Sequence, residues 1–217
     1  MADIFHEVDE EVRRERLKQL WQRYGTVFVA VAVLIVVGIG GWRFYQYSEA
    51  KKAAQAGADF EAAITLSEQG KHTEAEAAFA KIAGEAPAGY RTLARLRVAA
   101  ELATRDQKAA VAAYDEIAAD ASVGQTMQDA AALRAALLLV DSAPFSEIKR
   151  RLGPLVESGR TFRHTARELL ALSAWRAGDA TSAKLYIDMI AADGDTPQGT
   201  RQRIDMLSAL ITSDSKG

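Results

Sequence analysis

The stretch GKHTEAEAAFAKIAGEAP, residues 70–87, holds the pattern from which the fold can be predicted. Ala75 is followed four residues later by Phe79 and seven residues later by Ile82, so small, aromatic and aliphatic side chains share one face of a helix. Gly70 suits a left-handed cap that ends a preceding helix, and Pro87 ends this one. The stretch therefore predicts the second helix of a helical hairpin.

The same helix face recurs three times further along the chain. The later triples are Ala110, Tyr114 and Ile117, then Ile148, Leu152 and Leu155, and finally Ala183, Ile187 and Ile190. Successive triples begin 35, 38 and 35 residues apart. Twelve residues before each triple stands a small residue that would allow two helices to cross closely: Ala63, Val98, Ala136 and Ala171. We therefore expect four hairpins, over 53–88, 89–123, 125–160 and 161–195, with a capping helix over 197–213.

This pattern resembles the tetratricopeptide repeat, a helix-turn-helix unit that stacks into an α-solenoid, and it implies an all-α fold. The third unit departs from the pattern, because Ile148 replaces the small residue and Gly153-Pro154 interrupts the second helix. The composition agrees with a helical fold, since the chain has 43 Ala but only 15 Gly and 4 Pro, and Ala is the best helix former.

Several classes of chemistry are excluded or disfavoured by composition. The chain has no Cys, so it cannot form a disulfide, a thiol nucleophile or a cysteine zinc site. Its net charge of −2 argues against a dedicated nucleic-acid binder. We expect His6, His72 and His164 on exposed helix surfaces, and Asp193-Gly194-Asp195 in a turn rather than a calcium loop. No catalytic site, cofactor or small-molecule substrate is predicted.

A second decisive stretch, GTVFVAVAVLIVVGIGGW from Gly25 to Trp42, is uncharged throughout. As a helix it would extend roughly 27 Å, close to the roughly 30 Å of a bilayer's hydrocarbon core. Aromatic residues flank it on both sides: Trp21, Tyr24, Trp42, Phe44, Tyr45 and Tyr47. Because it is apolar on every side, we expect a transmembrane helix over 25–45 rather than the core helix of a soluble protein.

Basic residues are denser before the span than after it: Arg13, Arg14, Arg16, Lys18 and Arg23, against Arg43, Lys51 and Lys52. The positive-inside rule then places residues 1–24 in the cytoplasm and exports residues 46–217. Residues 1–24 also predict an amphipathic helix, which could lie on the inner leaflet, run into the span or bind a partner. Ser48-Glu49-Ala50 leaves open cleavage before Lys51, which would release a soluble binder.

The first helix of each hairpin would line the concave side of the solenoid and could bind a partner there. When the four hairpins are aligned by their triples, eight residues of the first helices are predicted to point toward that side: Phe60, Ile64, Arg95, Leu133, Leu137, Glu168, Leu172 and Trp175. We expect Leu133 and Leu137 to pack between neighbouring hairpins instead. The other six form the predicted partner-binding groove, for an apolar or amphipathic segment, with Trp175 as its best single contact.

A charged cluster follows the third triple: Lys149, Arg150, Arg151, Arg160, Arg163 and Arg167. The last three would share a helix face and could bind acidic partners or anionic head groups. We prefer a solvated face whose charge is balanced by nearby acids: Glu147, Glu157 and Glu168.

With the repeats placed behind one N-terminal span, the whole chain resembles the YfgM family, ancillary subunits of the bacterial Sec translocon. The resemblance implies an inner-membrane protein of a Gram-negative bacterium. Its periplasmic repeats would bind Sec channel subunits, a membrane-bound periplasmic chaperone and exported clients. We therefore predict a non-enzymatic, membrane-tethered adaptor. The alternative is a structural or regulatory scaffold in cell division, envelope assembly or stress signalling, acting through the cytoplasmic helix.

Overall fold

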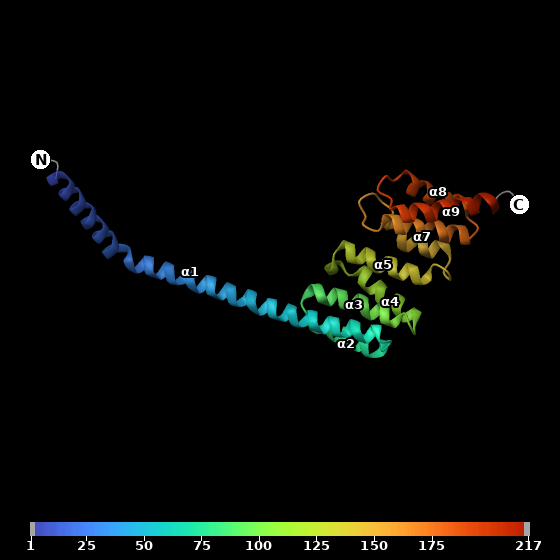
Figure 1. The fold of residues 1–217 in the computed structure, drawn as a ribbon, viewed down its shortest axis with the longest axis horizontal. Helices are drawn as coiled ribbons and strands as arrows, with labels where there is room; N and C mark the ends of the chain where they lie inside the picture. The colour runs from blue at the N-terminus through green and yellow to red at the C-terminus, as the bar shows by residue number, and fades with distance from the viewer. Residues whose placement is uncertain (1–2, 215–217) are drawn as a thin grey trace. The chain divides into compact units, whose positions relative to one another are not determined.

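The computed structural model describes residues 3–214, and all regular secondary structure in this range is helical. Its longest element, α1, runs without a break from Asp3 to Glu68 (Figure 1). The chain divides within α1 into two compact units, Met1–Ala54 and Gln55–Gly217. The first unit contains the N-terminal part of α1, and the second contains its end together with all later helices.

The apolar stretch lies within the first unit, and α1 continues through both predicted ends of the span. Among the described residues, the segment Trp21–Glu68 holds the one helix that is long and apolar enough to cross a membrane. Its large apolar side chains from Val27 to Ile39 are exposed, as are Trp42 and Tyr47. The side chains of Ile4, Val8 and Val12, which carry the predicted amphipathic face of residues 1–24, lie outside the described part of the chain.

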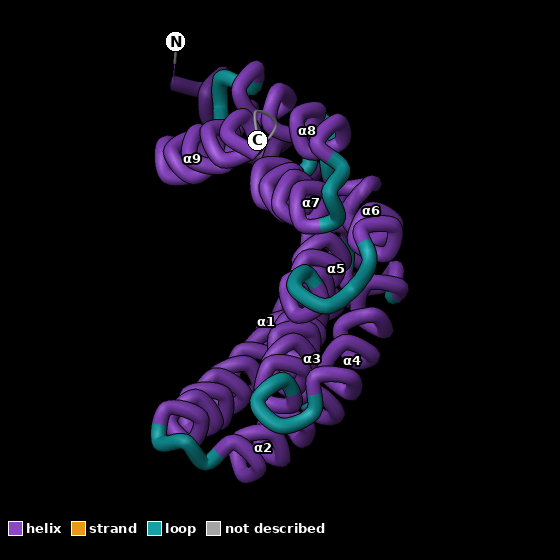
Figure 2. Tube along the Cα trace, turned by 90° about the vertical axis from the view of Figure 1, so that its right-hand side faces the viewer, coloured by secondary structure: helices purple, strands orange, loops and turns teal. Residues whose placement is uncertain are grey.

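The second unit is a stack of helical hairpins. The end of α1 pairs with α2 (His72–Glu85), α3 (Ala88–Leu102) with α4 (Gln107–Ala119), α5 (Gln125–Leu139) with α6 (Phe145–Leu152), and α7 (Arg163–Arg176) with α8 (Ala180–Ala192). Short 3-10 helices form at η1 (Ala121–Val123) and η2 (Gly153–Leu155), and α9 (Gln198–Asp214) follows the last hairpin. Figure 2 shows α3, α5 and α7 along one side of this stack, with α4, α6 and α8 along the other.

The four predicted triples form the core, and every member is buried, from Ala75 in α2 to Ile190 in α8. The apolar side chains gather in three clusters along the stack: one around Phe79, one around Tyr114, and the largest around Leu152 and Leu170. Each cluster is shared between consecutive hairpins, as a solenoid requires, because a single Ala-rich hairpin has no other way to cover its apolar face. The predicted all-α solenoid is confirmed.

The predicted orientation of α3 was wrong. Ala63, Ala136 and Ala171 are fully buried at the expected crossings, but Val98 is only partly buried, and Ala94 and Ala99 are the fully buried residues of α3. The turn that joins α3 to α4 covers residues 103–106, whereas the turns after α1 and α7 cover only 69–71 and 177–179. Burial at Ala99 in place of Val98 corresponds to a rotation of α3 about its axis by roughly 100°. Turn length does not account for it, because the turn before α6 is longer still, 140–144, and Ala136 is buried as predicted.

The third hairpin contains the predicted interruption. Its second helix, α6, ends at Leu152, and residues Gly153–Leu155 continue as the 3-10 helix η2. Pro154 explains this change, because it has no backbone N–H to donate and its ring clashes with the preceding turn of an α-helix.

Two of the turns depend on glycine, as predicted. Gly70 and Gly178 have φ of 74° and 75°, the left-handed region. In the first turn the N–H of Lys71 donates to the carbonyl oxygen of Leu66 at 3.0 Å, which satisfies a carbonyl at the end of α1.

Gly70→Ala should therefore lower the free energy of unfolding by about 1–2 kcal/mol, because a Cβ is strained at positive φ. Gly84→Ala is the matched control: Gly84 lies within α2, where Ala should raise the free energy of unfolding by about 0.5–1 kcal/mol. A Cβ at either position meets no atom within 4 Å, so only the backbone conformation differs. Denaturant unfolding of both variants measures this, and a shift of the same sign in both would contradict the account.

Candidate functional site

The first helices of the later hairpins each expose one narrow face. Together these faces form a surface that we call the inner face, made of Leu93, Arg97 and Ala100 on α3, Ala130, Arg134 and Leu137 on α5, and Thr165, Leu172 and Arg176 on α7. Spacings of three, four or seven residues place each set on one side of its helix. The three helices lie along the same side of the stack in Figure 2.

Three leucines dominate the inner face. Leu93 is 40% exposed, Leu137 45% and Leu172 37%, and each comes from a different hairpin. Leu172 belongs to the predicted groove. Leu133 is buried, as expected, but the expectation that Leu137 also packs between hairpins was wrong. Apolar side chains exposed on the same side of consecutive hairpins are typical of a surface that binds protein.

The other apolar residues of the predicted groove pack mainly at junctions between helices. The Phe60 ring lies edge-on to Phe79, with centroids 5.2 Å apart, and 6.1 Å from the ring of Tyr90. Ile64 packs against the same cluster, and half-buried Trp175 packs against the cluster of the last hairpins.

The two charged residues of the predicted groove form ion pairs. Arg95 donates to Asp120 at 2.6 Å, and Glu168 accepts from Arg203 of α9 at 2.5 and 2.8 Å. Leu172 thus remains on the inner face, while Arg95 and Glu168 connect neighbouring elements.

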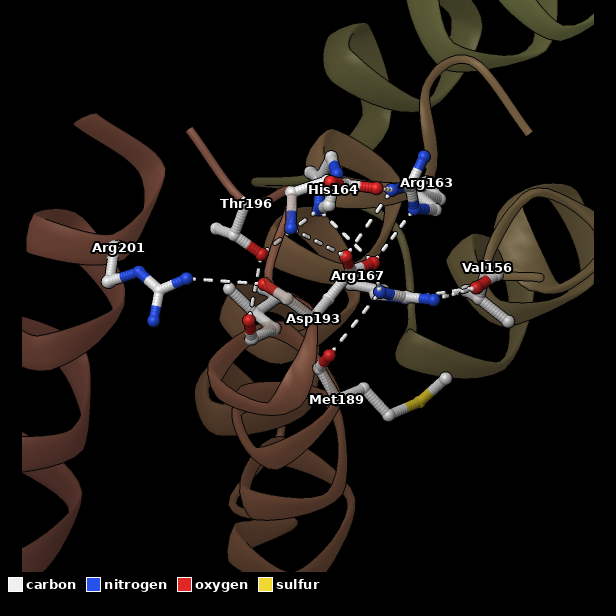
Figure 3. A network of polar contacts seen from close by, with 10 residues as sticks. Val156, Arg163, His164, Arg167, Met189, Asp193, Thr196 and Arg201 are labelled. Atoms are coloured by element: carbon white, nitrogen blue, oxygen red, sulfur yellow. Dashed lines mark hydrogen bonds and ion pairs between the residues drawn. The ribbon is translucent and has the colours of Figure 1, made fainter. Parts of the chain in front are cut away.

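A polar network centred on Asp193 closes the last hairpin (Figure 3). One oxygen of Asp193, Oδ2, accepts hydrogen bonds from Arg163 and Arg167, both at 2.8 Å. Arg167 is almost fully buried, and it also donates to the backbone carbonyl of Val156 at 2.6 and 2.9 Å and to that of Met189 at 3.3 Å. The network therefore connects the loop after η2, helix α7 and the end of α8.

His164 is buried in this network, so the expectation of an exposed histidine was wrong there. Its Nδ1 lies 3.2 Å from the hydroxyl of Thr196 and 3.8 Å from Oδ2 of Asp193. Burial lowers the pKa of His164 and favours its neutral form. His72 stays half-exposed, with Nδ1 2.7 Å from the buried carboxylate of Glu101, and the side chain of His6 lies outside the described residues. Residues 193–195 form the predicted turn.

Much of the charged cluster after the third triple is paired with distant acids, which corrects the sequence interpretation, although exposed Arg150 pairs with nearby Glu147 as expected. Arg151 donates to Asp115 in α4, and Arg160 donates to Asp129 in α5 at 3.1 Å. Arg160 precedes α7, which begins at Arg163, so it does not share a helix face with Arg163 and Arg167, which lie four residues apart within α7. Most of the partners are aspartates distant in sequence, because the stacking of hairpins brings such residues together.

The interrupted third hairpin also leaves a cleft of about 450 Å³ beside α4, α5 and α6. Its charged lining consists of Asp115, Asp129, Arg150, Arg151 and Arg160. Both aspartates accept hydrogen bonds from arginines of the cleft, and Arg150 pairs with Glu147 at 2.7 Å. These charges neutralise one another and hold the second and third hairpins together. Among the described residues, no group of His, Asp and Glu is arranged to hold a metal ion.

Asp193→Asn should change how the stability depends on pH. Arg163 and Arg167 hold the pKa of Asp193 well below its ordinary value, which is about 3.9. Because the folded-state pKa is depressed, this stabilisation is complete above about pH 4 and is lost as the pH falls further. Thermal melts below about pH 4 should show less acid destabilisation in Asp193→Asn than in the wild type. Asp195→Asn is the control, since Asp195 is highly exposed, and an equal change in both variants would contradict this assignment.

Sequence reasoning missed most members of the inner face, among them Leu93, Arg97 and Arg134. On α3 the predicted orientation was wrong, and Leu93 and Arg97 are exposed where Arg95 was expected. Arg134 lies three residues before Leu137, so it shares the exposed side of α5 with that residue.

Comparison with known proteins agrees with this architecture. Residues 18–169 match the family model described as a tetratricopeptide repeat-like domain. A protein of Haemophilus influenzae named ancillary SecYEG translocon subunit is 31% identical over 64 residues, which are 30% of this chain and 31% of that protein. The match thus spans about a third of that relative's length, and no solved structure matched. Because the family model covers well over half of the sequence, the chain belongs to the tetratricopeptide repeat-like domain family.

Proposed function

We propose that this protein is a non-enzymatic, membrane-tethered adaptor that holds other proteins against its inner face. The observation that carries the proposal is the exposure of Leu93, Leu137 and Leu172 on consecutive hairpins. A partner segment that covers these side chains would remove apolar surface from water, at roughly 25 cal/mol per Å². The surrounding ion pairs keep the hairpins in register, so the leucines are presented on a rigid surface.

The proposed anchor is residues 25–45 of α1. Its apolar side chains are exposed on all sides, which is costly in water but favourable in lipid. In this proposal residues 1–24 lie in the cytoplasm and residues 46–217 in the periplasm, because the basic residues are denser before the span. Reporter fusions at each end of the chain test this orientation, and a periplasmic signal from the N-terminal fusion would overturn it.

The proposed partners are subunits of the Sec translocon, together with a periplasmic chaperone and exported clients. The name of the Haemophilus influenzae relative supports this choice. An anchor in the same membrane as the translocon would raise the effective concentration of the two proteins, so weak contacts at the inner face would suffice.

Leu137→Asp should reduce the recovery of translocon subunits in affinity purification from detergent-solubilised membranes by about tenfold or more, because a charge replaces a central apolar contact. Leu185→Asp is the matched control: Leu185 is exposed on α8, on the other side of the stack, and recovery should stay unchanged. Equal recovery with both variants would count against the inner face.

Deletion of residues 1–24 distinguishes the adaptor from a scaffold that acts through the cytoplasmic helix. The adaptor should keep its periplasmic partners without these residues. Loss of function with partner recovery intact would favour the scaffold. A mature protein that begins at Lys51, measured by mass spectrometry, would instead favour a soluble binder.

A further inference from the structure

The inner face carries two arginines, Arg97 and Arg134, that form no ion pair among the described residues, unlike most other arginines of the second unit. Apart from Arg91, Arg97 and Arg134, every arginine from Arg91 to Arg203 donates to a carboxylate or to a backbone carbonyl. Within the described part of the chain, neither Arg97 nor Arg134 forms an ion pair with a carboxylate, and both are exposed. Two of these three exceptions, Arg97 and Arg134, lie on the surface proposed for partner binding.

The two arginines converge on one point of that surface. Arg97 comes from α3 and Arg134 from α5, and both lie close to the side chain of Tyr114 in α4, whose hydroxyl accepts a hydrogen bond from Arg134. Burial raises the pKa of Tyr114, and the two neighbouring guanidinium groups oppose part of this rise. Tyr114 is 3% exposed and belongs to one of the four buried triples, so it provides a fixed base beneath the two charges.

The apolar and basic groups alternate across the inner face. Arg97 lies one helical turn from Leu93, and Arg134 lies one turn from Leu137. The exposed positions of this face within α3 and α5 contain no Asp or Glu, and the first acid beyond α5 is Asp141. The nearby carboxylate of Glu168 is already bound to Arg203. The surface between α3 and α5 is therefore positively charged and lacks an internal counter-ion.

We infer that the inner face selects acidic amphipathic protein segments. Leu93, Leu137 and Leu172 contact the apolar side chains of such a segment, while Arg97 and Arg134 donate to its Asp or Glu carboxylates. The inference rests on the proposed function, and it adds the chemistry of the partner. Charge complementarity supports it, because guanidinium groups form strong, directional hydrogen bonds with carboxylates and raise the rate of association with acidic partners.

Three synthetic peptides test this inference on the full chain in nanodiscs of uncharged phosphatidylcholine. The peptides share one amphipathic leucine pattern and carry Glu, Gln or Lys at all their polar positions. The Glu peptide should bind most tightly, and Arg97→Gln or Arg134→Gln should each weaken it by about tenfold without changing the affinity of the Gln peptide. Added salt should reduce the difference between the Glu and Gln peptides.

Arg91→Gln is the matched control, because Arg91 is an exposed arginine of α3 that lies off the inner face. Its binding of the Glu peptide should equal that of the wild type. The double variant Arg97→Glu with Arg134→Glu should prefer the Lys peptide to the Glu peptide. Circular dichroism of each variant confirms that the helices remain folded.

The outcomes separate this inference from the proposed function. Equal affinity for the Glu and Gln peptides, with both lost in Leu137→Asp, would overturn the acidic preference and leave the apolar surface intact. Peptide binding that Leu137→Asp does not alter would instead count against the inner face itself. Binding of anionic phospholipid vesicles that depends on Arg97 and Arg134, without binding of the Glu peptide, would also overturn the inference, in favour of lipid.

Discussion

Phe79→Ala is expected to lower the free energy of unfolding by roughly 3–5 kcal/mol, which makes it one of the most damaging single changes in this chain. Phe79 is completely buried and is the largest side chain of the cluster formed by the end of α1, α2 and α3. Most of its neighbours are alanines or partly buried residues, so little can move to fill the cavity. The edge-to-face contact with Phe60 would be lost as well.

The region that Phe79→Ala destabilises is as informative as the change in the free energy of unfolding. Stability in a solenoid depends on each repeat and its nearest neighbours, so hydrogen exchange should accelerate in α2 and the end of α1 before it does in α7 and α8. Leu185→Ala is the control, since Leu185 is 56% exposed and its truncation should change the free energy of unfolding little. A Phe79→Ala variant with wild-type stability and uniform exchange would contradict this description of the core.

Arg167→Leu is expected to lower the free energy of unfolding by about 3–5 kcal/mol, the cost of breaking a buried charged pair by removing one partner. The Arg167 side chain is only 6% exposed. Its removal takes a donor from the carbonyls of Val156 and Met189 and leaves the Asp193 carboxylate with one arginine, Arg163, in place of two. Leucine keeps much of the volume, so the loss reports on hydrogen bonds and charge more than on packing.

Arg150→Leu is the matched control for this variant. Arg150 also pairs with a carboxylate, Glu147, but it is largely exposed, so its loss should have no large effect on stability. Denaturant unfolding of both variants at neutral pH makes the comparison. Equal stability of Arg167→Leu and the wild type would show that the Asp193 network contributes little to the closure of the last hairpin.

The hairpins could be predicted from sequence because burial repeats at short range. The triple that begins at Ala75 places three buried side chains on one helix face, and the same spacing returns three times. The break at Pro154 and the cap at Gly70 could also be predicted, because each depends on the backbone of one residue. The rotation of α3 was missed because a small buried residue stands twelve positions before the triple in α1, α5 and α7, but not in α3.

The polar contacts could not be predicted in the same way. Asp193 is the centre of a network only because a turn brings it to Arg163 and Arg167, which come from a helix that begins thirty residues earlier. The sequence interpretation assigned the arginines of the charged cluster to local glutamates, which is right for Arg150 but not for Arg163 and Arg167. Leu137 was missed for a related reason, since a leucine in an Ala-rich helix fits a packed position equally well. Its exposure depends on the placement of the neighbouring hairpins.

The central claim is that the inner face contacts the translocon while α1 anchors the chain in the membrane. Site-specific photocrosslinking in living cells tests it most directly, with a photoreactive side chain at Leu137 on the inner face or at Leu185 on the opposite side of the stack. The account predicts that the probe at Leu137 forms crosslinks to translocon subunits and that the probe at Leu185 does not. Translocon crosslinks of equal yield from both positions, or from Leu185 alone, would contradict it.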